Sequence, residues 1–179
     1  YDRRTYPTKG TKWNLMAELY TDNGVKYDGK RMFPVVSAFW EGAFRLTNRF
    51  TFLPWIGGRA ILNDEYSFAI ANMMGGNAPG RYVNHQLPFV GINYMELAGS
   101  KLFTAGIRFR QRMGTNHYVT LTGNTGVQHD EWRHLFDRMM WGGGVSYGYD
   151  TFLGPLEITF NYSNITHKLG TYISFGYEF

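Results

Sequence analysis

The chain has 179 residues, enough for one domain, and it contains no cysteine, which excludes disulfide bonds, thiolate metal sites and cysteine nucleophiles. Aromatic residues make up 18% of the chain and glycine contributes 22 residues, a composition too rich in aromatics for a disordered protein. The net charge of +4, with only 18% charged residues and no basic run, permits an anionic partner without requiring one.

No run of 18 apolar residues occurs, so the sequence predicts no transmembrane helix. No signal peptide is visible and the chain opens on Tyr1 rather than methionine, so we expect a processed or excised piece of a longer protein. High aromatic and glycine content without apolar runs is typical of outer-membrane β-barrels, whose strands alternate between lipid-facing and lumen-facing residues.

Alternation of apolar with polar residues predicts eight strands, and no segment with a helical period competes with them. In chain order, the alternating stretches cover residues 12–19, 36–47, 51–62, 103–112, 118–122, 141–150, 156–163 and 172–179. Phe39 is the one misfit in the second stretch. Pro54 and Gly57-Gly58 interrupt the third, where we expect a bulge or kink. Most strands have about 9–12 residues, the span that a tilted strand needs to cross a bilayer.

Short and long connections alternate along the chain. The short ones lie at 49–50, 114–116 and 153–155, whereas the longer segments cover residues 22–34, 63–100, 124–139 and 163–170. This spacing predicts an antiparallel up-and-down meander, with short periplasmic turns and longer extracellular loops. No repeat or second-domain boundary appears, so residues 1–179 form one unit.

Alternation alone does not separate a soluble sandwich from a membrane barrel, because both have one apolar face on each strand. Two features favour the membrane. The strands are longer than the roughly 5–6 residues typical of soluble sheets. Trp and Tyr also gather near strand ends, where the aromatic girdles of barrels lie. The sequence therefore predicts an all-β, antiparallel up-and-down transmembrane β-barrel with eight strands in this chain.

The stretch Gly144-Val145-Ser146-Tyr147-Gly148 fits the G-x-S-x-G pattern of serine hydrolases. That pattern needs a strand, a tight turn and a helix to expose the serine hydroxyl. Here it lies within an alternating strand, and no helix follows. We therefore interpret the glycines as small residues on the lumen face that leave room for a loop, and we expect no catalytic residue in this chain.

A second candidate is the cluster of metal-type ligands in 129–137, where His129-Asp130-Glu131-Trp132-Arg133-His134 is followed by Asp137. It has neither helical His-x-x-x-His spacing nor a cysteine partner, so the geometry of a metal site is unsupported. We interpret it as an exposed charged loop, with a loop cation site or binding of lipopolysaccharide phosphates as alternatives. We expect no cofactor and no resident metal.

Arg108, Arg110 and Arg112 share one face of a predicted strand. On a lipid face each would cost roughly 2–4 kcal/mol near the midplane, so we expect them in the lumen, opposite Glu41 or Glu157. A salt-bridge ladder, anion selectivity and docking of an acidic plug are the alternatives, whereas nucleic-acid binding is disfavoured because no exposed basic stripe accompanies them. The expected lumen-facing charges are Glu41, Arg45, Arg108, Arg110, Arg112 and Glu157.

Three stretches together resemble a known family. Residues 2–10, Asp-Arg-Arg-Thr-Tyr-Pro-Thr-Lys-Gly, resemble the aspartate-arginine … tyrosine/phenylalanine-proline-threonine-x-glycine turn of the BamA/TamA-type assembly-factor barrels, the bacterial surface antigen family. Gly154-Pro155-Leu156 resembles the glycine-proline-leucine before the penultimate strand of that family. The end of the chain looks like the C-terminal assembly signal of outer-membrane proteins, with Ile173, Phe175, Tyr177 and Phe179 at alternate positions.

The resemblance implies the C-terminal half of a sixteen-stranded barrel. Within the superfamily, the sequence is most similar to the barrel of Bacteroidetes patatin-like phospholipases, which implies that a serine–aspartate hydrolase domain precedes this chain. The barrel would then anchor or display a lipid acyl hydrolase in the bacterial outer membrane. The valine-arginine-glycine-phenylalanine signature of the assembly factors' lumen loop is absent from 78–89, where Arg81 is a candidate for a similar lumen contact.

Other functions remain open alternatives. One is a self-contained eight-stranded structural or adhesive barrel, and another is an assembly or secretion pore, against which the missing loop signature argues. A soluble enzyme ranks last. The expected partners are outer-membrane lipid and lipopolysaccharide, the barrel assembly machinery acting on the C-terminal strand, an absent N-terminal barrel half with its hydrolase domain, and a second copy in a homodimer.

Overall fold

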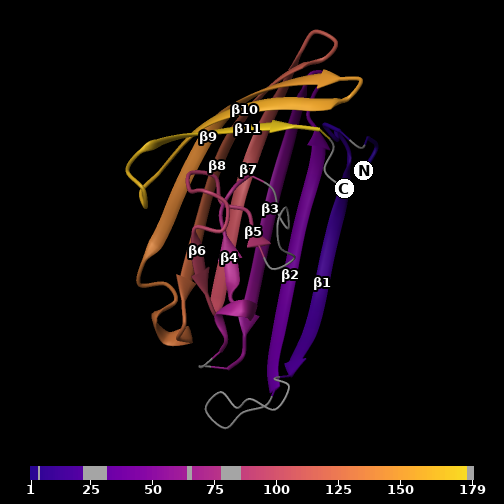
Figure 1. Ribbon diagram of the computed structural model, residues 1–179. Helices are drawn as coiled ribbons and strands as arrows, with labels where there is room; N and C mark the ends of the chain where they lie inside the picture. Colours follow the sequence, from indigo (N-terminus) through magenta and orange to yellow (C-terminus); the bar gives the residue numbers. More distant parts are fainter. Residues whose placement is uncertain (4, 22–31, 64–65, 78–85, 177–179) are drawn as a thin grey trace.

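The computed structural model describes residues 1–3, 5–21, 32–63, 66–77 and 86–176. It contains one large antiparallel sheet in which strands that follow one another in the sequence are neighbours in space, in the order β1-β2-β3-β7-β8-β9-β10-β11 (Figure 1). The strands are β1 (Gly10–Thr21), β2 (Met32–Arg45), β3 (Phe50–Ile61), β7 (Lys101–Met113), β8 (His117–His129), β9 (Met139–Thr151), β10 (Gly154–Ser163) and β11 (Leu169–Phe175). The prediction of eight strands in an up-and-down meander is confirmed.

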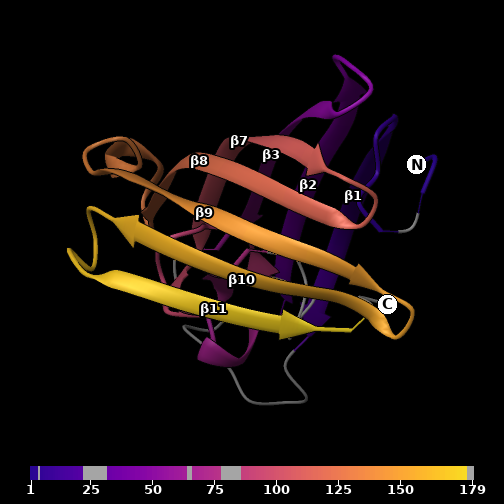
Figure 2. The ribbon, with the colours of Figure 1, turned by 90° about the horizontal axis from the view of Figure 1, so that it is seen from above.

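The sheet curls around the segment that connects β3 to β7 (Figure 2). That segment contains the single 3-10 turn η1 (Phe68–Ile70) and three short strands in the order β5-β4-β6. These strands are β4 (Asn72–Met74), β5 (Gln86–Leu87) and β6 (Leu97–Gly99). We call its described parts, residues 66–77 and 86–100, the inner segment. The sequence predicted a long extracellular connection over 63–100 and, by resemblance, matched 78–89 to the lumen loop of the assembly factors. The inner segment folds back over the concave face of the sheet, so it does not extend outward as an extracellular loop.

The irregularity expected in β3 is an interruption of one ladder at Pro54, and β3 has no bulge. The pairing of β3 with β7 keeps one register from Phe50 opposite Gln111 to Ala60 opposite Lys101. On the β2 side the same register runs from Val35 to Arg45, and only the positions opposite Leu53 and Pro54 lack a pair. Proline has no N–H to donate to a ladder. A local gap in one ladder is therefore enough to accommodate Pro54, without a shift of the strand.

The two faces of the sheet differ in polarity. Because successive side chains of a strand point to opposite faces, the outer face carries the apolar series and leaves it exposed: Trp13 is 67% exposed and Ile173 is 71% exposed. Other exposed members are Leu15, Leu19, Val36, Phe44, Ile56, Ile107, Leu121, Val145, Tyr147, Phe160, Tyr162 and Phe175. The inner face buries Thr51, Arg59, Thr104, Thr120, Thr122, Asn124, Ser146, Thr159, Asn161 and Ser163.

The hydrophobic core lies between the concave face and the inner segment. From the sheet it contains Phe39, Trp55, Leu102 and Met140; from the inner segment it contains Met74, Leu87, Phe89 and Ile92. Phe39, which broke the alternation in the sequence, therefore points inward and packs with the inner segment. These four apolar residues of the otherwise polar inner face belong to one cluster with the inner segment.

Within the described residues the sheet is not closed, since β1 pairs only with β2 and β11 only with β10. Both free edges and both ends of the chain are visible in Figures 1 and 2. The described helices are η1 and the single turn η2 (Trp132–His134), and neither is long and apolar enough to cross a membrane.

Candidate functional site on the concave face

Arg59, on the inner face of β3, ties the beginning of the inner segment to the sheet. It is 3% exposed, and its Nη2 lies 2.6 Å from Glu18 Oε2 on β1. Its Nε donates to Asn72 Oδ1 at 2.8 Å, and Asn72 Nδ2 donates back to the Arg59 carbonyl at 3.1 Å. Burial of a guanidinium is tolerated when its charge is paired and its N–H groups are hydrogen-bonded, as they are here, so we assign Arg59 a structural role. The network joins β1, β3 and the inner segment.

The stretch 88–92 is bound to the other side of the sheet by side chains of four strands. Thr104 Oγ1 on β7 donates to the Pro88 carbonyl at 3.0 Å. Asn124 on β8 accepts from the Val90 N–H at 2.9 Å and donates to the Val90 carbonyl at 3.3 Å. Further contacts come from Ser163 Oγ on β10, which donates to the Gly91 carbonyl at 2.7 Å, and from the Tyr172 hydroxyl on β11, which donates to the Ile92 carbonyl. The inner face therefore satisfies the backbone of an irregular segment.

Glycines on the inner face let this backbone approach closely. A Cβ on Gly142 would lie 2.3 Å from the Val90 carbonyl oxygen, and one on Gly126 would lie 3.3 Å from the Phe89 ring. Gly91 has φ +118 and its own Cβ would lie 2.6 Å from the Tyr162 carbonyl oxygen, so only glycine fits there. Of the lumen-face glycines of β9, Gly142 and Gly144 leave room for Val90 of the inner segment, whereas Gly148 leaves room for Tyr6 of the N-terminal segment.

A third anchor lies at the long-loop end. The Asp130 carboxylate accepts hydrogen bonds from the Ser100 N–H at 2.8 Å and from the Tyr66 hydroxyl at 3.1 Å. Lys101, fully buried, donates to the Asp130 carbonyl and lies 5.6 Å from the centre of the Trp132 ring. Partial burial alone would raise the pKa of Asp130, but the hydrogen bonds outweigh it and hold that pKa below its ordinary value. Burial and the nearby Asp130 charge raise the pKa of Tyr66 to about 12.

The three arginines of β7 lie on the concave face, but they do not form the expected ladder with Glu41 or Glu157. Arg108 lies 4.4 Å over the Trp55 ring and donates to the Asn77 carbonyl at 2.8 Å. Arg110 lies 5.1 Å over the Tyr6 ring and donates to the Pro7 carbonyl at 3.2 Å, and Arg112 donates to the Asn48 carbonyl at 3.4 Å.

The salt-bridge expectation is wrong for a geometric reason. Glu41 on β2 and Glu157 on β10 stand two and three strands away from β7, and adjacent strands are separated by about 4.8 Å. Among the described residues neither carboxylate lies within 4.0 Å of an arginine of β7. Backbone carbonyls and aromatic faces solvate the three guanidinium groups instead.

The other predicted site residues are spread over both faces of the sheet and its ends. Glu41 and Glu157 are half-buried on the concave face, and Arg45 is exposed at the end of β2. Ile173 and Phe175 are exposed on the outer face of β11. Arg81, Tyr177 and Phe179 lie outside the described residues. Asn72, Asn124, Ser163 and Tyr172 were missed, since an inward polar residue in a strand does not indicate in the sequence which loop it binds.

Neither of the two chemical motifs forms a reactive arrangement. Ser146 lies in β9, where its hydroxyl is 2.7 Å from that of Thr159 on β10, so the strand–turn–helix of a hydrolase is replaced by regular sheet. In the loop 130–138, His134 Nδ1 lies 2.6 Å from Asp137 Oδ2 and its Nε2 is 4.0 Å from Glu131. No group of three or more metal-type ligands is present in the described part of the chain.

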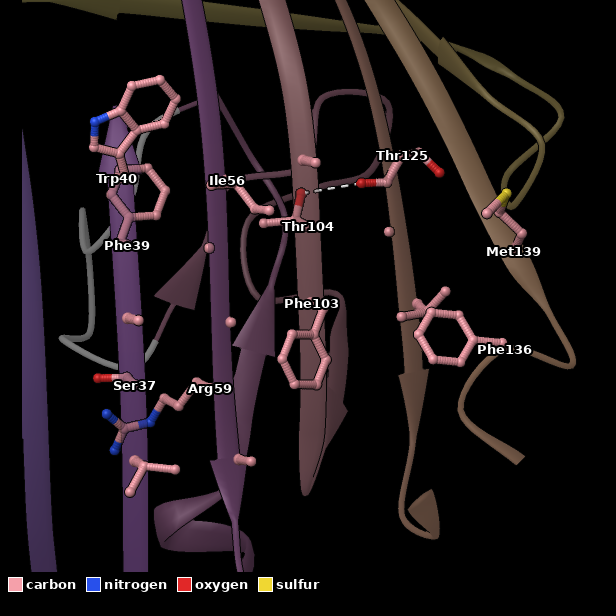
Figure 3. Close-up of a pocket in the computed structure, with 18 of the residues that line it drawn as sticks. Ser37, Phe39, Trp40, Ile56, Arg59, Phe103, Thr104, Thr125, Phe136 and Met139 are labelled. Carbon is pink, nitrogen blue, oxygen red and sulfur yellow. Dashed lines mark hydrogen bonds between the residues drawn. The ribbon is translucent and has the colours of Figure 1, made fainter. Parts of the chain in front are cut away.

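The outer face has a hollow of its own, which Figure 3 shows over β2, β3, β7 and β8. Its volume is about 530 Å³. Small residues such as Ala38, Gly58 and Ala105 are among those that line it. The aromatic residues Phe103 and Phe136 also line it. A Cβ on Gly58 would lie 2.4 Å from the Phe103 ring, so the absence of a side chain lets that ring lie across β3. The lining of the hollow is almost entirely apolar.

A family model described as the OMP85 superfamily matches residues 1–179. The match covers the eight-stranded sheet together with the inner segment. A search of curated proteins finds no match for the chain.

Proposed function

The chain belongs to the OMP85 superfamily of bacterial outer-membrane β-barrels, and we propose that it anchors a patatin-like lipid acyl hydrolase of the same polypeptide in that membrane. In this proposal the chain contributes the last eight strands of a larger barrel. The resemblance of residues 2–10 and 154–156 to the assembly-factor barrels, and of the whole chain to the barrels of patatin-like phospholipases, motivates it. The hydrolase serine and aspartate would lie upstream of Tyr1.

The observation that carries the anchoring role is the filled concave face. Hydrogen bonds from β7, β8, β10 and β11 bind the inner segment at 88–92, and the Arg59 network binds it at Asn72. An interior occupied by a packed, hydrogen-bonded segment favours a scaffold over a passage for substrates. For this reason we rank the anchor above an assembly or secretion pore.

The open edges support the half-barrel. In the described residues β1 and β11 each leave one side of their backbone unpaired. Backbone groups in the hydrocarbon region must be satisfied within the protein, because the bilayer offers no partner. Eight further strands would pair both edges, whereas a self-contained barrel would require β1 to pair with β11.

Lipid contact follows from the same architecture. The exposed apolar residues of the outer face would lie in the bilayer, and the hollow beside Phe103 and Phe136 would accept an acyl chain of an outer-membrane lipid or lipopolysaccharide. Ile173 and Phe175, with Tyr177 and Phe179 beyond them, would present the C-terminal strand to the barrel assembly machinery.

The first experiment determines the intact mass of the native polypeptide from outer membranes, together with the shift of its gel mobility on heating, which reports a folded barrel. We expect a mass several-fold above the 20.7 kDa of this chain and a heat-dependent shift. A mass near 20.7 kDa with the same shift would indicate a self-contained barrel and contradict the anchor.

Two assays of the purified native protein complete the test. Lipid acyl ester hydrolysis is expected, and it should be abolished when the upstream nucleophilic serine is replaced by alanine. In planar bilayers the folded protein should show little ion conductance. A folded, full-length barrel without hydrolysis would contradict the hydrolase proposal. A large, stable conductance would favour an assembly or secretion pore.

A further inference from the structure

A cavity of about 210 Å³ lies at the short-turn end of the sheet, away from the inner segment. Arginine supplies five of its described lining residues, and none of them is acidic. The arginines are Arg3, Arg45, Arg49, Arg110 and Arg112, and Thr8, Asn48 and Thr51 add hydroxyl and amide groups. In outer-membrane barrels the short turns lie on the periplasmic side, so the cavity opens toward the periplasm.

The register of the sheet gathers these side chains. Arg45 of β2 is paired with Thr51 of β3, and Thr51 is paired with Arg110 of β7, so the three lie in one row across the concave face. Arg112 follows two residues further along the same face of β7. Since these positions are set by backbone pairing, the concentration of positive charge is a property of the folded sheet and not of a flexible tail.

The N-terminal segment covers the row. Tyr6 stacks on Tyr118 of β8 with ring centroids 3.9 Å apart. Asp2 holds the turn together, because its carboxylate accepts from the Thr8 N–H at 2.8 Å, the Thr8 hydroxyl at 2.6 Å and the Lys9 N–H at 2.9 Å. Slight burial would raise the pKa of Asp2, but these hydrogen bonds outweigh it and hold the pKa well below its usual range. The turn that these hydrogen bonds close places Arg3, Tyr6 and Thr8 along the cavity.

The charge of the row is not neutralised by the described part of the protein. No described carboxylate lies within 4.0 Å of the five arginines. Glu157 attracts Arg110 only from a greater distance. Two buried donors, the Nε groups of Arg110 and Arg112, have no hydrogen-bond partner. Buried N–H donors of charged groups without acceptors are costly, and such an arrangement is stable when an anion supplies the acceptors.

We propose that this cavity is a binding site for a phosphate group, carried by soluble phosphate or a small phosphate ester of the periplasm. Guanidinium groups bind tetrahedral oxyanions through paired N–H donors, and the Thr51 hydroxyl and the Asn48 amide offer further donors. The site faces the interior of the sheet rather than its lipid-facing side, which favours a soluble phosphate over a lipid headgroup. The inference does not depend on the hydrolase proposal.

The test uses the native full-length protein, purified from outer membranes in detergent. Isothermal titration with inorganic phosphate at low ionic strength should show saturable binding of one phosphate per chain. Sodium chloride at matched ionic strength should give no such isotherm. Arg49→Gln and Arg112→Gln should each weaken binding roughly tenfold or more, the effect expected for loss of one charge-assisted contact. Arg133→Gln, in the exposed loop at the opposite end, removes the same charge and should leave the affinity unchanged.

The heat-dependent gel shift reports whether each variant is folded, and Arg49 lies in a surface turn where its replacement is least disruptive. Equal weakening by Arg133→Gln would overturn the site in favour of a general charge effect. Absence of saturable phosphate binding to the folded native protein would also overturn it, and would indicate that the arginines hold an acidic segment of the polypeptide. Binding of vesicles containing phosphatidylglycerol that soluble phosphate does not displace would assign the site to a lipid headgroup instead.

Discussion

The two faces of the eight-stranded sheet are built on opposite rules. On the outer face, Phe160 and Ile173 are exposed, and none of the described residues covers them. On the inner face, Asn124 and Ser163 are buried and hydrogen-bonded to the backbone of the inner segment. In a soluble sheet the apolar face would be the buried one. The inversion shows that the outer face is built for a hydrocarbon solvent and the inner face for specific polar contacts.

This difference has energetic consequences. A side chain of the outer face contacts fluid lipid chains, so it must be apolar, but its size and shape can vary. A residue of the inner face meets a fixed backbone, so it is constrained in shape as well as in polarity. A charge placed on the outer face, or a Cβ added on the inner face, therefore tests the difference between the two faces most directly.

The largest expected effect is a charge on the outer face. Ile107 is the central residue of β7, so Ile107→Arg should lower the free energy of unfolding by up to about 4 kcal/mol, the cost of arginine at the bilayer midplane. Gln111→Arg, on the same face near the end of β7, is the matched control and should cost no more than about 1 kcal/mol. Urea unfolding of the native protein in liposomes measures both. Equal costs would show that this face does not lie in the hydrocarbon.

The next effect concerns the buried ion pair of the inner face. Glu18→Gln leaves the charge of buried Arg59 uncompensated, and it should cost about 3 kcal/mol, the low end of the range for broken buried pairs because Glu18 is 28% exposed. Glu41→Gln removes a charge from the same face where no ion pair within 4.0 Å exists among the described residues. A comparable loss in both variants by urea unfolding would contradict a specific role for the Glu18–Arg59 pair.

Replacement of glycine by alanine tests how much space each face leaves for a side chain. Gly142→Ala places a Cβ 2.3 Å from the Val90 carbonyl oxygen and should cost about 2 kcal/mol through displacement of the inner segment. Gly123→Ala makes the same chemical change on the outer face, where nothing lies within 4 Å, and should be close to neutral. Hydrogen exchange of the Val90 and Gly91 amides, followed by mass spectrometry, should accelerate only in Gly142→Ala. Unchanged exchange there would mean that 88–92 is not seated on β9.

The sequence was sufficient for the large sheet because its signal is local. The alternation of Phe160 with Asn161 recurs along each strand, and it reports the two environments directly. The contacts of the inner segment could not be predicted, because its partners are remote: Val90 binds Asn124, and Gly91 binds Ser163. Only the resemblance pointed to a lumen loop, at 78–89. One sign was present in Phe39, whose apolar side chain on a polar face marks the place where the inner segment packs.

The arginines illustrate the same limit at the candidate site. The spacing of two residues predicted that the three arginines share one face of β7. It did not predict their partners, because Trp55, Tyr6 and Asn48 come from three other parts of the chain. The prediction of Glu41 or Glu157 as partners rested on charge alone, without the distances between the strands. In the folded sheet, strand order sets the distance between charges, and Glu157 stands three strands away from β7.

The smallest expected effect lies in the exposed loop 130–138, outside both faces. The hydrogen bond and charge of Asp137 raise the pKa of His134 above its ordinary value. The protonated ring is thus favoured by the folded loop, so the contact is fully present below the ordinary histidine pKa and is lost as pH rises through the raised one. Asp137→Asn should return the pKa of His134 toward its ordinary value, as measured by NMR titration of the histidine ring. Because the pair is solvent-exposed, the melting temperature should hardly change; a large change would place this loop among the structural anchors of the sheet.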